Sequence, residues 1–299
     1  MRHLKKIYMA IAAAALLAGG CASRYDALMA SSDADLKYKG AFEYFNSGKY
    51  EKAGALFESL AVLTSNTSRD DTVQFYQGLS NYKFGDYPKA EAQFATFISH
   101  YPRSPFTEQA NFLDLDCLYK ETYRYELDQT PTYTCINAIS EFLRSFPDSE
   151  YGSDCRAMLK DLNDRLDRKA YENARLYYKM EDYKAARVAF KNVLKDDSEN
   201  IYREDILYYI AMSSYNYARL SYPEKQKDRY LIFIDDYLNF IGEIPDSPYR
   251  KELNVMYARA QRALGKYSGT DEQVKAKEKD FEKERRAAAK AEQKKEKSE

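Results

Sequence analysis

Hydrophobic and polar positions follow the period of an amphipathic helix along most of the chain. Small and aromatic residues recur three or four positions apart between residues 34 and 268, and short segments with Gly, Pro or Ser separate the runs. Residues three and four apart share one face of a helix, whereas a half-buried strand needs strict alternation. The pattern therefore predicts an all-α fold built from consecutive helices.

One arrangement of residues occurs three times without gaps. A small residue is followed 12 positions later by Ala and 16 positions later by Phe, with Tyr three positions before that Ala. A small residue allows two helices to approach closely, and Gly before the Tyr allows a turn with positive φ. Ala and Phe one helical turn apart then fill the contact between helices, so each copy predicts a hairpin of a helix A and a helix B. The copies are Ala41, Gly48, Tyr50, Ala53, Phe57; Gly78, Gly85, Tyr87, Ala90, Phe94; and Ala174, Glu181, Tyr183, Ala186, Phe190.

A second motif marks the junctions between hairpins. In it Pro ends helix B, Ser is expected to cap the following helix, and an aromatic residue packs across the junction. Together the two motifs predict a right-handed superhelix of about five tetratricopeptide-like hairpins. The excess length is assigned to insertions at Tyr125–Tyr133 and Ser221–Asp228. The junction copies are Tyr101–Phe106, Phe146–Tyr151 and Ile244–Tyr249, with Asp197–Tyr202 as a degenerate copy.

The N-terminus predicts export and lipidation. Arg2, Lys5 and Lys6 precede an uncharged run too short to span a bilayer, which is typical of a signal peptide. Small residues lead into Cys21, and Leu17–Cys21 is similar to a bacterial lipobox, although Ala18 stands where Leu is most common. We therefore expect cleavage before Cys21 and acylation of that residue. The alternative is an ordinary secretory signal with an incidental Cys.

The expected organisation has five parts. A signal peptide at 1–20 is followed by a lipidated spacer at 21–33, two N-terminal hairpins at 34–110 and three C-terminal hairpins at 111–268. Residues 269–299 form a charged tail, with ten basic and nine acidic residues from Asp271 onward, too polar to pack as a domain. The expected location is the outer membrane, lipid-anchored and facing the periplasm.

Charge and cysteine content narrow the function classes. Cleavage changes the net charge from −1 to −4, which gives no reason to expect nucleic acid or an anionic membrane surface as a partner. Three cysteines remain, Cys117, Cys135 and Cys155, with no Cys-x-x-Cys spacing. We expect them to be buried and unpaired, although one pair could form a disulfide in an oxidising compartment.

Candidate catalytic chemistry is scarce. His100 is the one histidine of the mature chain, and its place at the end of a helix B predicts a structural role. The sequence has no zinc-ligand spacing, phosphate-binding Gly loop or Gly-x-Ser-x-Gly motif. We therefore expect no enzyme, no metal and no cofactor. What remains is recognition by an exposed surface.

The repeat frame selects a candidate binding groove. In tetratricopeptide folds, helix A side chains line the inner groove, and aromatic groups exposed there usually mean binding. The alternative is that neighbouring hairpins or the N-terminal arm cover these side chains. The candidates are Tyr38, Phe42, Phe45, Asn46, Phe75, Leu79, Tyr82 and Lys83.

These motifs together resemble the BamD family, the tetratricopeptide lipoproteins of the β-barrel assembly machine. The resemblance covers nearly all of residues 17–265 and is carried by the lipobox, Gly48–Ala53, Gly85–Ala90, His100–Pro105 and Tyr183–Ala186. It implies a scaffold that binds POTRA domains of the BamA-like barrel subunit through a surface between about Tyr171 and Arg262. It also implies unfolded outer-membrane proteins as clients in the N-terminal groove, and accessory Bam lipoproteins as further partners.

Two other classes stay open from sequence alone. One is a SusD-like lipoprotein that captures carbohydrate with a TonB-dependent transporter, although such chains are usually longer and rich in Trp, which this chain lacks. The other is a different envelope adaptor with tetratricopeptide hairpins, such as the Tol-associated proteins. The proteins that co-purify after crosslinking would separate the three.

Overall fold

The structure is a computed structural model that describes residues 24–265, and all regular structure in this range is helical. The chain divides into two compact units, Met1–Leu162 and Asn163–Glu299, with the division inside the long helix α9 (Gly152–Lys179). The predicted signal peptide, Cys21 and the charged tail lie outside the described residues. The described helices confirm the predicted all-α fold of tetratricopeptide-like hairpins.

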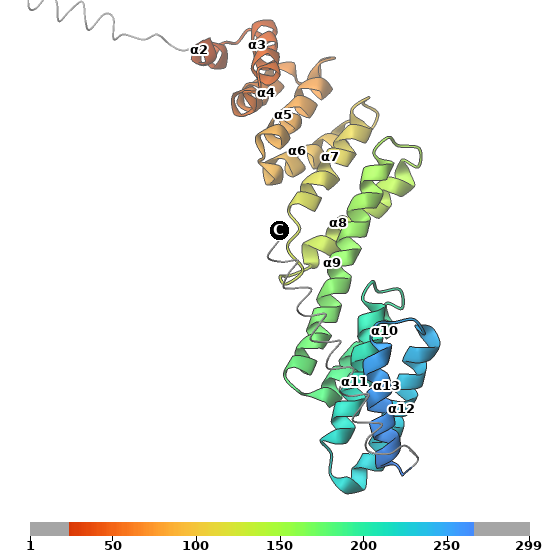
Figure 1. Cartoon of the computed structure of the whole chain (residues 1–299). Coiled ribbons are helices and arrows are strands. Elements are labelled where there is room, and N and C mark those ends of the chain that lie inside the picture. Colours follow the sequence, from red (N-terminus) through yellow and green to blue (C-terminus); the bar gives the residue numbers. More distant parts are fainter. Residues whose placement is uncertain (1–23, 266–299) are drawn as a thin grey trace, which may run out of the picture. The chain divides into compact units, whose positions relative to one another are not determined.

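The first unit contains three helical hairpins and the beginning of α9. The two helices of each hairpin pack against each other, and successive hairpins pack through α4 with α5 and α6 with α7 (Figure 1). A short helix, α2, precedes the first hairpin. The bounds are α2 (Arg24–Ala30), α3 (Ala34–Asn46), α4 (Tyr50–Thr64), α5 (Asp70–Phe84), α6 (Tyr87–His100), α7 (Thr107–Lys120) and α8 (Thr130–Ser145).

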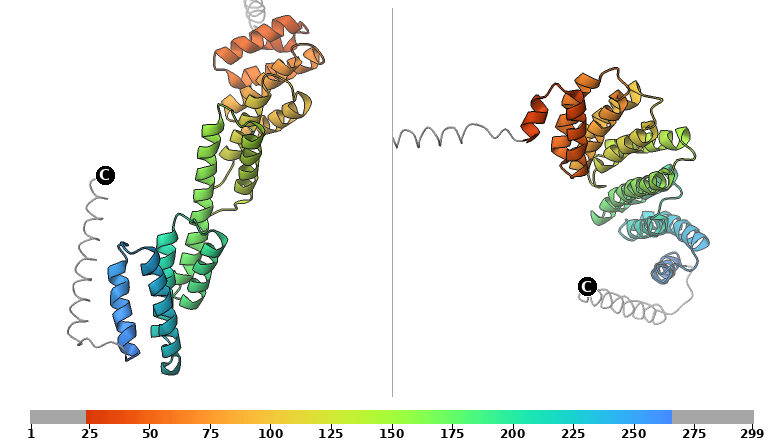
Figure 2. Two further views of the ribbon diagram at one scale, coloured as in Figure 1. Left: turned by 90° about the vertical axis from the view of Figure 1, so that its right-hand side faces the viewer. Right: turned by 90° about the horizontal axis from the view of Figure 1, so that it is seen from above.

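The second unit contains the fourth and fifth hairpins and a final helix. The end of α9 pairs with α10, and α10 to α13 lie side by side in chain order (Figure 2). Seventeen buried residues form one continuous core across these helices. The bounds are α10 (Tyr183–Asp196), α11 (Arg203–Arg219), α12 (Pro223–Glu243) and α13 (Arg250–Ala263).

The repeat positions are the core of each hairpin. All three helix B alanines and all three phenylalanines of the motif are fully buried. The small residue is required by close approach at Gly78, because a Cβ added there would lie 2.9 Å from Cε1 of Phe94. A full side chain at this position would displace the ring, as the spacing predicted.

The turn between helices A and B has the same backbone conformation in all three copies. Gly48 and Gly85 have φ of 74° and 92°, and Glu181 has φ of 62°. In each turn, the amide of the left-handed residue and the amide of the next residue donate hydrogen bonds that close a Schellman motif, such as Lys49 N to Tyr44 O at 2.9 Å. Glu181 therefore adopts a left-handed conformation that Gly would adopt without strain.

The junction motif acts differently from the predicted cap. Ser104 Oγ accepts a hydrogen bond from the amide of Phe106 at 3.3 Å, and it is Phe106 that occupies the N-cap position of α7. The expectation that Ser itself caps the following helix was therefore wrong. Ser instead closes a turn two residues earlier, and Asn200 has the same role in the degenerate copy, where it accepts from Tyr202 N at 2.9 Å.

The junction aromatic residue stacks on an aromatic residue of the preceding helix A. At the four predicted junctions the ring centroids lie 4.2 to 4.6 Å apart and the ring planes within 20°. This confirms that the aromatic residue packs across the junction, and it supplies the helix A partner that the motif lacked. The pairs are Phe75–Phe106, Phe112–Tyr151, Tyr171–Tyr202 and Tyr208–Tyr249.

Three expected boundaries differ from those in the structure. Residues 24–30 of the expected spacer form α2, whose Leu28 is 4% exposed in the core of the first hairpin. The expected division after residue 110 falls inside α7. The insertion predicted at Tyr125–Tyr133 is a loop at residues 121–129, and most of the one predicted at Ser221–Asp228 lies in α12, which begins at Pro223.

Cys117, Cys135 and Cys155 are fully buried and none is in a disulfide, as expected for these thiols. Burial raises the pKa of Cys117 to about 12 and that of Cys155 to about 11. Among the described helices, none combines the length and the hydrophobicity needed to cross a membrane.

Candidate functional site

Four of the predicted groove residues form two equivalent pairs, one on each of two successive A helices. Phe42 and Asn46 lie one turn apart on α3, and Leu79 and Lys83 occupy the same repeat positions on α5. The two apolar side chains are half-buried, and Asn46 and Lys83 are exposed. We call these four residues the helix A stripe.

An aromatic cluster supports the α3 part of the stripe. The ring of Phe42 lies 4.6 Å from that of Tyr76 and 5.1 Å from that of Phe57, and Phe45 lies 5.2 Å from Tyr76. Tyr76 of α5 is thus the hub of this cluster, and the repeat frame did not select it. Part of the side-chain surface of Phe42 and Phe45 is therefore covered by this cluster. This agrees with the alternative that neighbouring hairpins cover the groove side chains.

Phe75 must be removed from the candidate groove. Its side chain is 1% exposed and stacks on Phe106 at the junction between the second and third hairpins, which we call the second junction. The position lies three residues before Gly78, and on a helix this spacing places it toward the junction rather than toward solvent. A ligand cannot reach Phe75 without opening the core.

Tyr38 occupies the same repeat position as Phe75 in the first hairpin. Its partner is the guanidinium of Arg69, whose Cζ lies 4.9 Å from the ring centroid. Thr67 accepts a hydrogen bond from the Arg69 amide at 3.3 Å, as Ser104 does for Phe106. The first junction, at residues 65–69 between the first and second hairpins, therefore repeats the others with a cation–π contact in place of stacked rings. The sequence motif missed this junction because Arg replaces the aromatic residue.

Tyr82 brings two cations to the α5 part of the site. Its hydroxyl donates a hydrogen bond to Asp116 of α7, and burial, followed by this bond, raises the pKa of Tyr82. The ammonium groups of Lys83 and Lys120 both lie 5.9 Å from the Tyr82 ring centroid. Lys120 also pairs with Asp116 at 3.0 Å, and Lys83 is an exposed cation beside the same ring.

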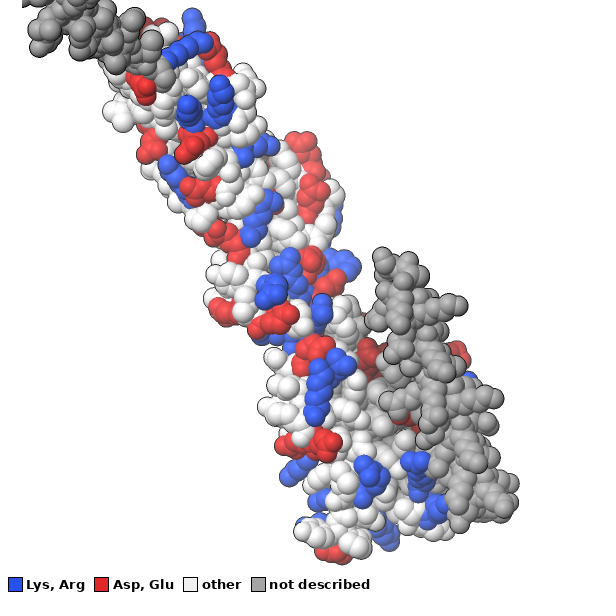
Figure 3. Space-filling view, turned by 60° about the vertical axis from the view of Figure 1, so that its left-hand side comes forward, with Lys and Arg blue, Asp and Glu red and all other residues white. Residues whose placement is uncertain are grey.

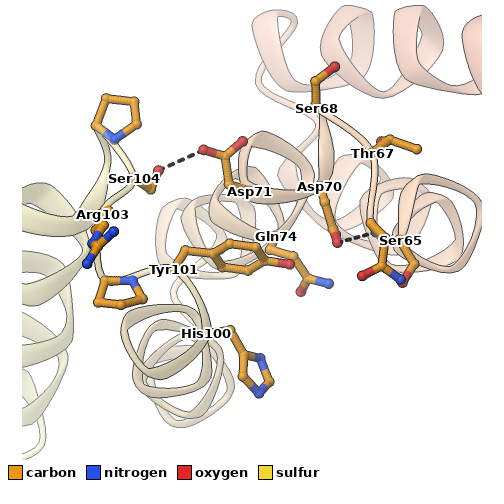
Figure 4. Close-up of a pocket in the computed structure, with 13 residues that line it drawn as sticks. Ser65, Thr67, Ser68, Asp70, Asp71, Gln74, His100, Tyr101, Arg103 and Ser104 are labelled. Atoms are coloured by element: carbon orange, nitrogen blue, oxygen red, sulfur yellow. Dashed lines mark hydrogen bonds between the residues drawn. The ribbon is translucent and has the colours of Figure 1, made fainter.

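A separate hollow of about 980 Å³ lies between the first and second junctions (Figure 4). Residues 65–68 and the start of α5 form one wall, and residues 100–105 form the other. Ser104 joins the walls by donating a hydrogen bond to Asp71 at 2.8 Å. The sequence motif identified residues 101–106 as a junction but missed the junction at residues 65–69, and it gave no sign that the two enclose a hollow.

Polar groups face this hollow. Tyr101 extends toward Gln74 and Asp70, and His100 projects from the end of α6 (Figure 4). Burial, followed by interaction with Asp70, raises the pKa of Tyr101 to about 12. Asp70 accepts from the Asn66 amide at 2.8 Å through Oδ2, while its buried Oδ1 has no hydrogen-bond partner. The side chains that line the hollow thus offer a carboxylate acceptor and hydroxyl groups.

Charge and metal-binding capacity do not single out a further site. Basic and acidic side chains are interspersed on the face shown in Figure 3. Within residues 24–265, no group of three or more His, Cys, Asp or Glu side chains is placed to hold a metal ion.

The sequence profile of one protein family matches residues 30–231, and the family is described as "YfiO: Outer membrane lipoprotein". Curated relatives carry the description "Outer membrane protein assembly factor BamD". The protein of Caulobacter vibrioides is 29% identical over 118 residues, which covers 40% of this chain and 39% of that protein. The protein of Rickettsia prowazekii is 22% identical over 210 residues, 70% of this chain and 84% of that protein. For Neisseria gonorrhoeae the figures are 24% over 201 residues, 64% and 74%.

Solved structures of tetratricopeptide proteins are also similar to this chain. The TPR2AB domain complex of yeast Sti1 matches with a TM-score of 0.40 and 14% identity, over 77% of this chain and 84% of that chain. A tetratricopeptide protein from Parabacteroides merdae matches with a TM-score of 0.31 and 13% identity, over 83% and 78%. At these scores, the fold assignment comes from the hairpins themselves.

Proposed function

Since the chain belongs to the YfiO family of outer-membrane lipoproteins, the BamD family, we propose that it is a non-enzymatic scaffold for outer-membrane protein assembly. The family match carries the proposal, because residues 30–231 contain the first four hairpins and most of the fifth. A stack of hairpins offers extended surfaces for other proteins rather than a site for chemistry. Cys21 provides the lipid anchor, and the scaffold faces the periplasm from the outer membrane.

The helix A stripe is the proposed client site. Phe42 and Leu79 supply half-buried apolar surface, and Lys83 supplies an exposed ammonium group beside the Tyr82 ring. The C-terminal strand of an outer-membrane protein carries alternating apolar side chains and a free carboxylate. The apolar side chains of the stripe suit those of the strand, and the Lys83 ammonium suits its terminal carboxylate.

The proposed docking surface for the barrel subunit lies on the second unit. Exposed apolar side chains gather at the α9–α10 hairpin, where Met180 is 57% exposed, Val188 52% and Tyr177 42%. Tyr177 and Val188 line a hollow of about 420 Å³. Exposed apolar surface next to a hollow is typical of protein interfaces, and a POTRA domain is the proposed occupant.

Client binding can be tested with a peptide of about ten residues that ends in Phe with a free carboxylate. We expect Lys83→Glu to weaken binding about tenfold, which corresponds to about 1.4 kcal/mol. The matched control is Lys89→Glu, which makes the same charge change on α6, where Lys89 pairs with Glu58 at 3.1 Å. Amidation of the peptide should remove the difference between the wild type and Lys83→Glu. If Lys83→Glu binds the free peptide as the wild type does, the client assignment is wrong.

The scaffold assignment can be tested by mild crosslinking in cells, followed by purification of the lipidated chain. We expect a barrel protein with POTRA domains among the partners, and its yield should fall when Val188→Asp and Tyr177→Asp disrupt the α9–α10 surface. Recovery of a TonB-dependent sugar transporter in its place would contradict the proposal and favour carbohydrate capture.

A further inference from the structure

The first hairpin begins almost at the predicted lipid anchor, because α2 is part of its core. Leu28 is 4% exposed, and it packs so closely on α3 that a Cβ added at Gly40 would lie 2.5 Å from Leu28 Cδ1. Lys37, itself 4% exposed, donates hydrogen bonds to Met29 O at 3.1 Å and Ser59 Oγ at 2.8 Å. These bonds join the end of α2 to both helices of the hairpin.

The start of α2 is held at the opposite end of α3, beside the turn between α3 and α4. Arg24 forms an ion pair with Glu43, and the Tyr25 ring meets the Tyr44 ring edge-on at 5.6 Å. The Lys52 ammonium lies 5.1 Å from the Tyr25 ring centroid. The chain therefore enters the fold at the end of the hairpin that carries the turn at residues 47–49.

The covalent tether between anchor and fold is short. Only Ala22 and Ser23 stand between Cys21 and Arg24. Whatever its conformation, a chain spans at most about 3.6 Å per residue, so Arg24 stays within about 11 Å of Cys21. A flexible spacer over residues 21–33 would have allowed a root-mean-square separation of about 20 Å and a much larger maximum.

We infer that the end of the first hairpin around the α3–α4 turn rests on the phospholipid headgroups of the membrane that holds the anchor. The inference depends on the proposed acylation of Cys21. Headgroups add about 5 to 7 Å to each side of the hydrocarbon layer. A tether of at most about 11 Å therefore holds Arg24 in or just outside the headgroup layer. The surface there consists of tyrosine rings with cations over them, Tyr44 with Lys49 and Tyr25 with Lys52. Tyrosine and cationic side chains are both favoured at the membrane–water interface.

The contact is set by the tether rather than by net charge. Glu43 and Glu51 lie close to Arg24 and Tyr25, and they offset part of the positive charge of this surface. The membrane contact should therefore change little with salt, unlike that of a polybasic patch. It also places Asn46, the end of the helix A stripe, beside the bilayer.

The test uses the full-length lipidated chain in vesicles of phosphatidylethanolamine and phosphatidylglycerol. A fluorophore is attached to Ser47→Cys at the turn, which leaves Lys49 and Lys52 in place, or, as the matched control, to Ser68→Cys after the far end of α4. Both positions are exposed, while Cys117, Cys135 and Cys155 are buried and will not react. The 15 residues of α4 separate the labels by about 20 Å. Lipids with a headgroup quencher report the depth of each label.

We expect at least threefold stronger quenching at Ser47→Cys than at Ser68→Cys, at both low and high salt. An insert of about twelve Gly and Ser residues between Ser23 and Arg24 should reduce quenching at Ser47→Cys to the level of the control. Equal quenching at the two positions, or no effect of the insert, would overturn the inference. Mass spectrometry of Cys21 and vesicle flotation separate the two failures. An unacylated chain that does not float contradicts the anchor, whereas an acylated, floating chain with equal quenching contradicts only the docked orientation.

Discussion

The second and fourth hairpins use the same repeat position with opposite charge. The residue directly after the helix B alanine is Glu91 in the second hairpin and Arg187 in the fourth. Each faces a carboxylate of the next hairpin, Asp114 on α7 or Asp236 on α12. One pair is repulsive and the other attractive, although the alanine and phenylalanine beside them are fully buried in both hairpins. The small and aromatic core therefore sets the packing, and the neighbouring helix decides the electrostatics.

The fourth hairpin satisfies its buried carboxylate. The side chain of Asp236 is 6% exposed. Arg187 donates to both of its oxygens, at 2.6 and 2.9 Å, and Lys191 lies 3.1 Å from Oδ1. The carboxylate that faces the second hairpin differs, because Asp114 Oδ1 is buried with no hydrogen-bond partner. Burial, followed by repulsion from Glu91, raises the pKa of Asp114 to about 7.

The largest expected effect breaks the attractive pair. Arg187→Ala should lower the free energy of unfolding by about 3 kcal/mol, because it leaves the buried Asp236 with Lys191 alone. Urea unfolding monitored on the second unit measures this change. The double variant Arg187→Ala, Asp236→Ala removes both charges and should recover most of the loss. A double variant as unstable as the single one would show that Arg187 acts through packing rather than charge.

The next effect removes the repulsive carboxylate. In the unfolded chain the Asp114 carboxyl ionises near pH 4, whereas in the fold its pKa is about 7. Its contribution to stability is therefore complete below pH 4 and is lost as the pH rises toward and through 7. Asp114→Asn should leave stability at pH 4 nearly unchanged. Above pH 7 it should raise the unfolding free energy by on the order of 2 kcal/mol, since one pKa unit corresponds to about 1.4 kcal/mol and partial exposure reduces the effect.

Urea unfolding of the wild type and Asp114→Asn across pH 4 to 8 measures this difference. Asp236→Asn is the matched control and should destabilise at neutral pH, because it weakens a bidentate pair. Parallel pH profiles for the wild type and Asp114→Asn would contradict the assignment of a buried, repelled carboxyl at Asp114.

The hairpins could be predicted from sequence because their spacing rules are local. The Tyr-x-x-Ala start of helix B, the Gly turn and the Pro of the junction each depend on residues within one or two helical turns. Even Glu181, which is not Gly, was placed correctly in the turn because Tyr183 and Ala186 keep the frame.

The binding surface was harder to predict because exposure depends on contacts between hairpins. Phe42 and Phe75 both belong to helix A, yet one is half-buried and the other is covered by Phe106, which is 31 residues away in sequence. Similarly, residues 22–33 contain no apolar run, yet Leu28 of α2 is buried in the core of the first hairpin, since Gly40 leaves space for it. Neither fact follows from the local pattern.

The smallest expected change in the free energy of unfolding concerns the turn between helices A and B, where the second and fourth hairpins also differ. Gly85 and Glu181 share a left-handed backbone, with φ of 92° and 62°, and only Gly adopts it without steric cost. Glu181→Gly should therefore stabilise the second unit by about 1 kcal/mol, whereas Gly85→Ala should destabilise the first by a similar amount. Urea midpoints of the two variants at pH 7 measure both changes. A loss of stability in Glu181→Gly would mean that contacts of the Glu side chain outweigh the strain. Opposite signs would show that the turn geometry belongs to the repeat and that Glu181 is tolerated at a cost.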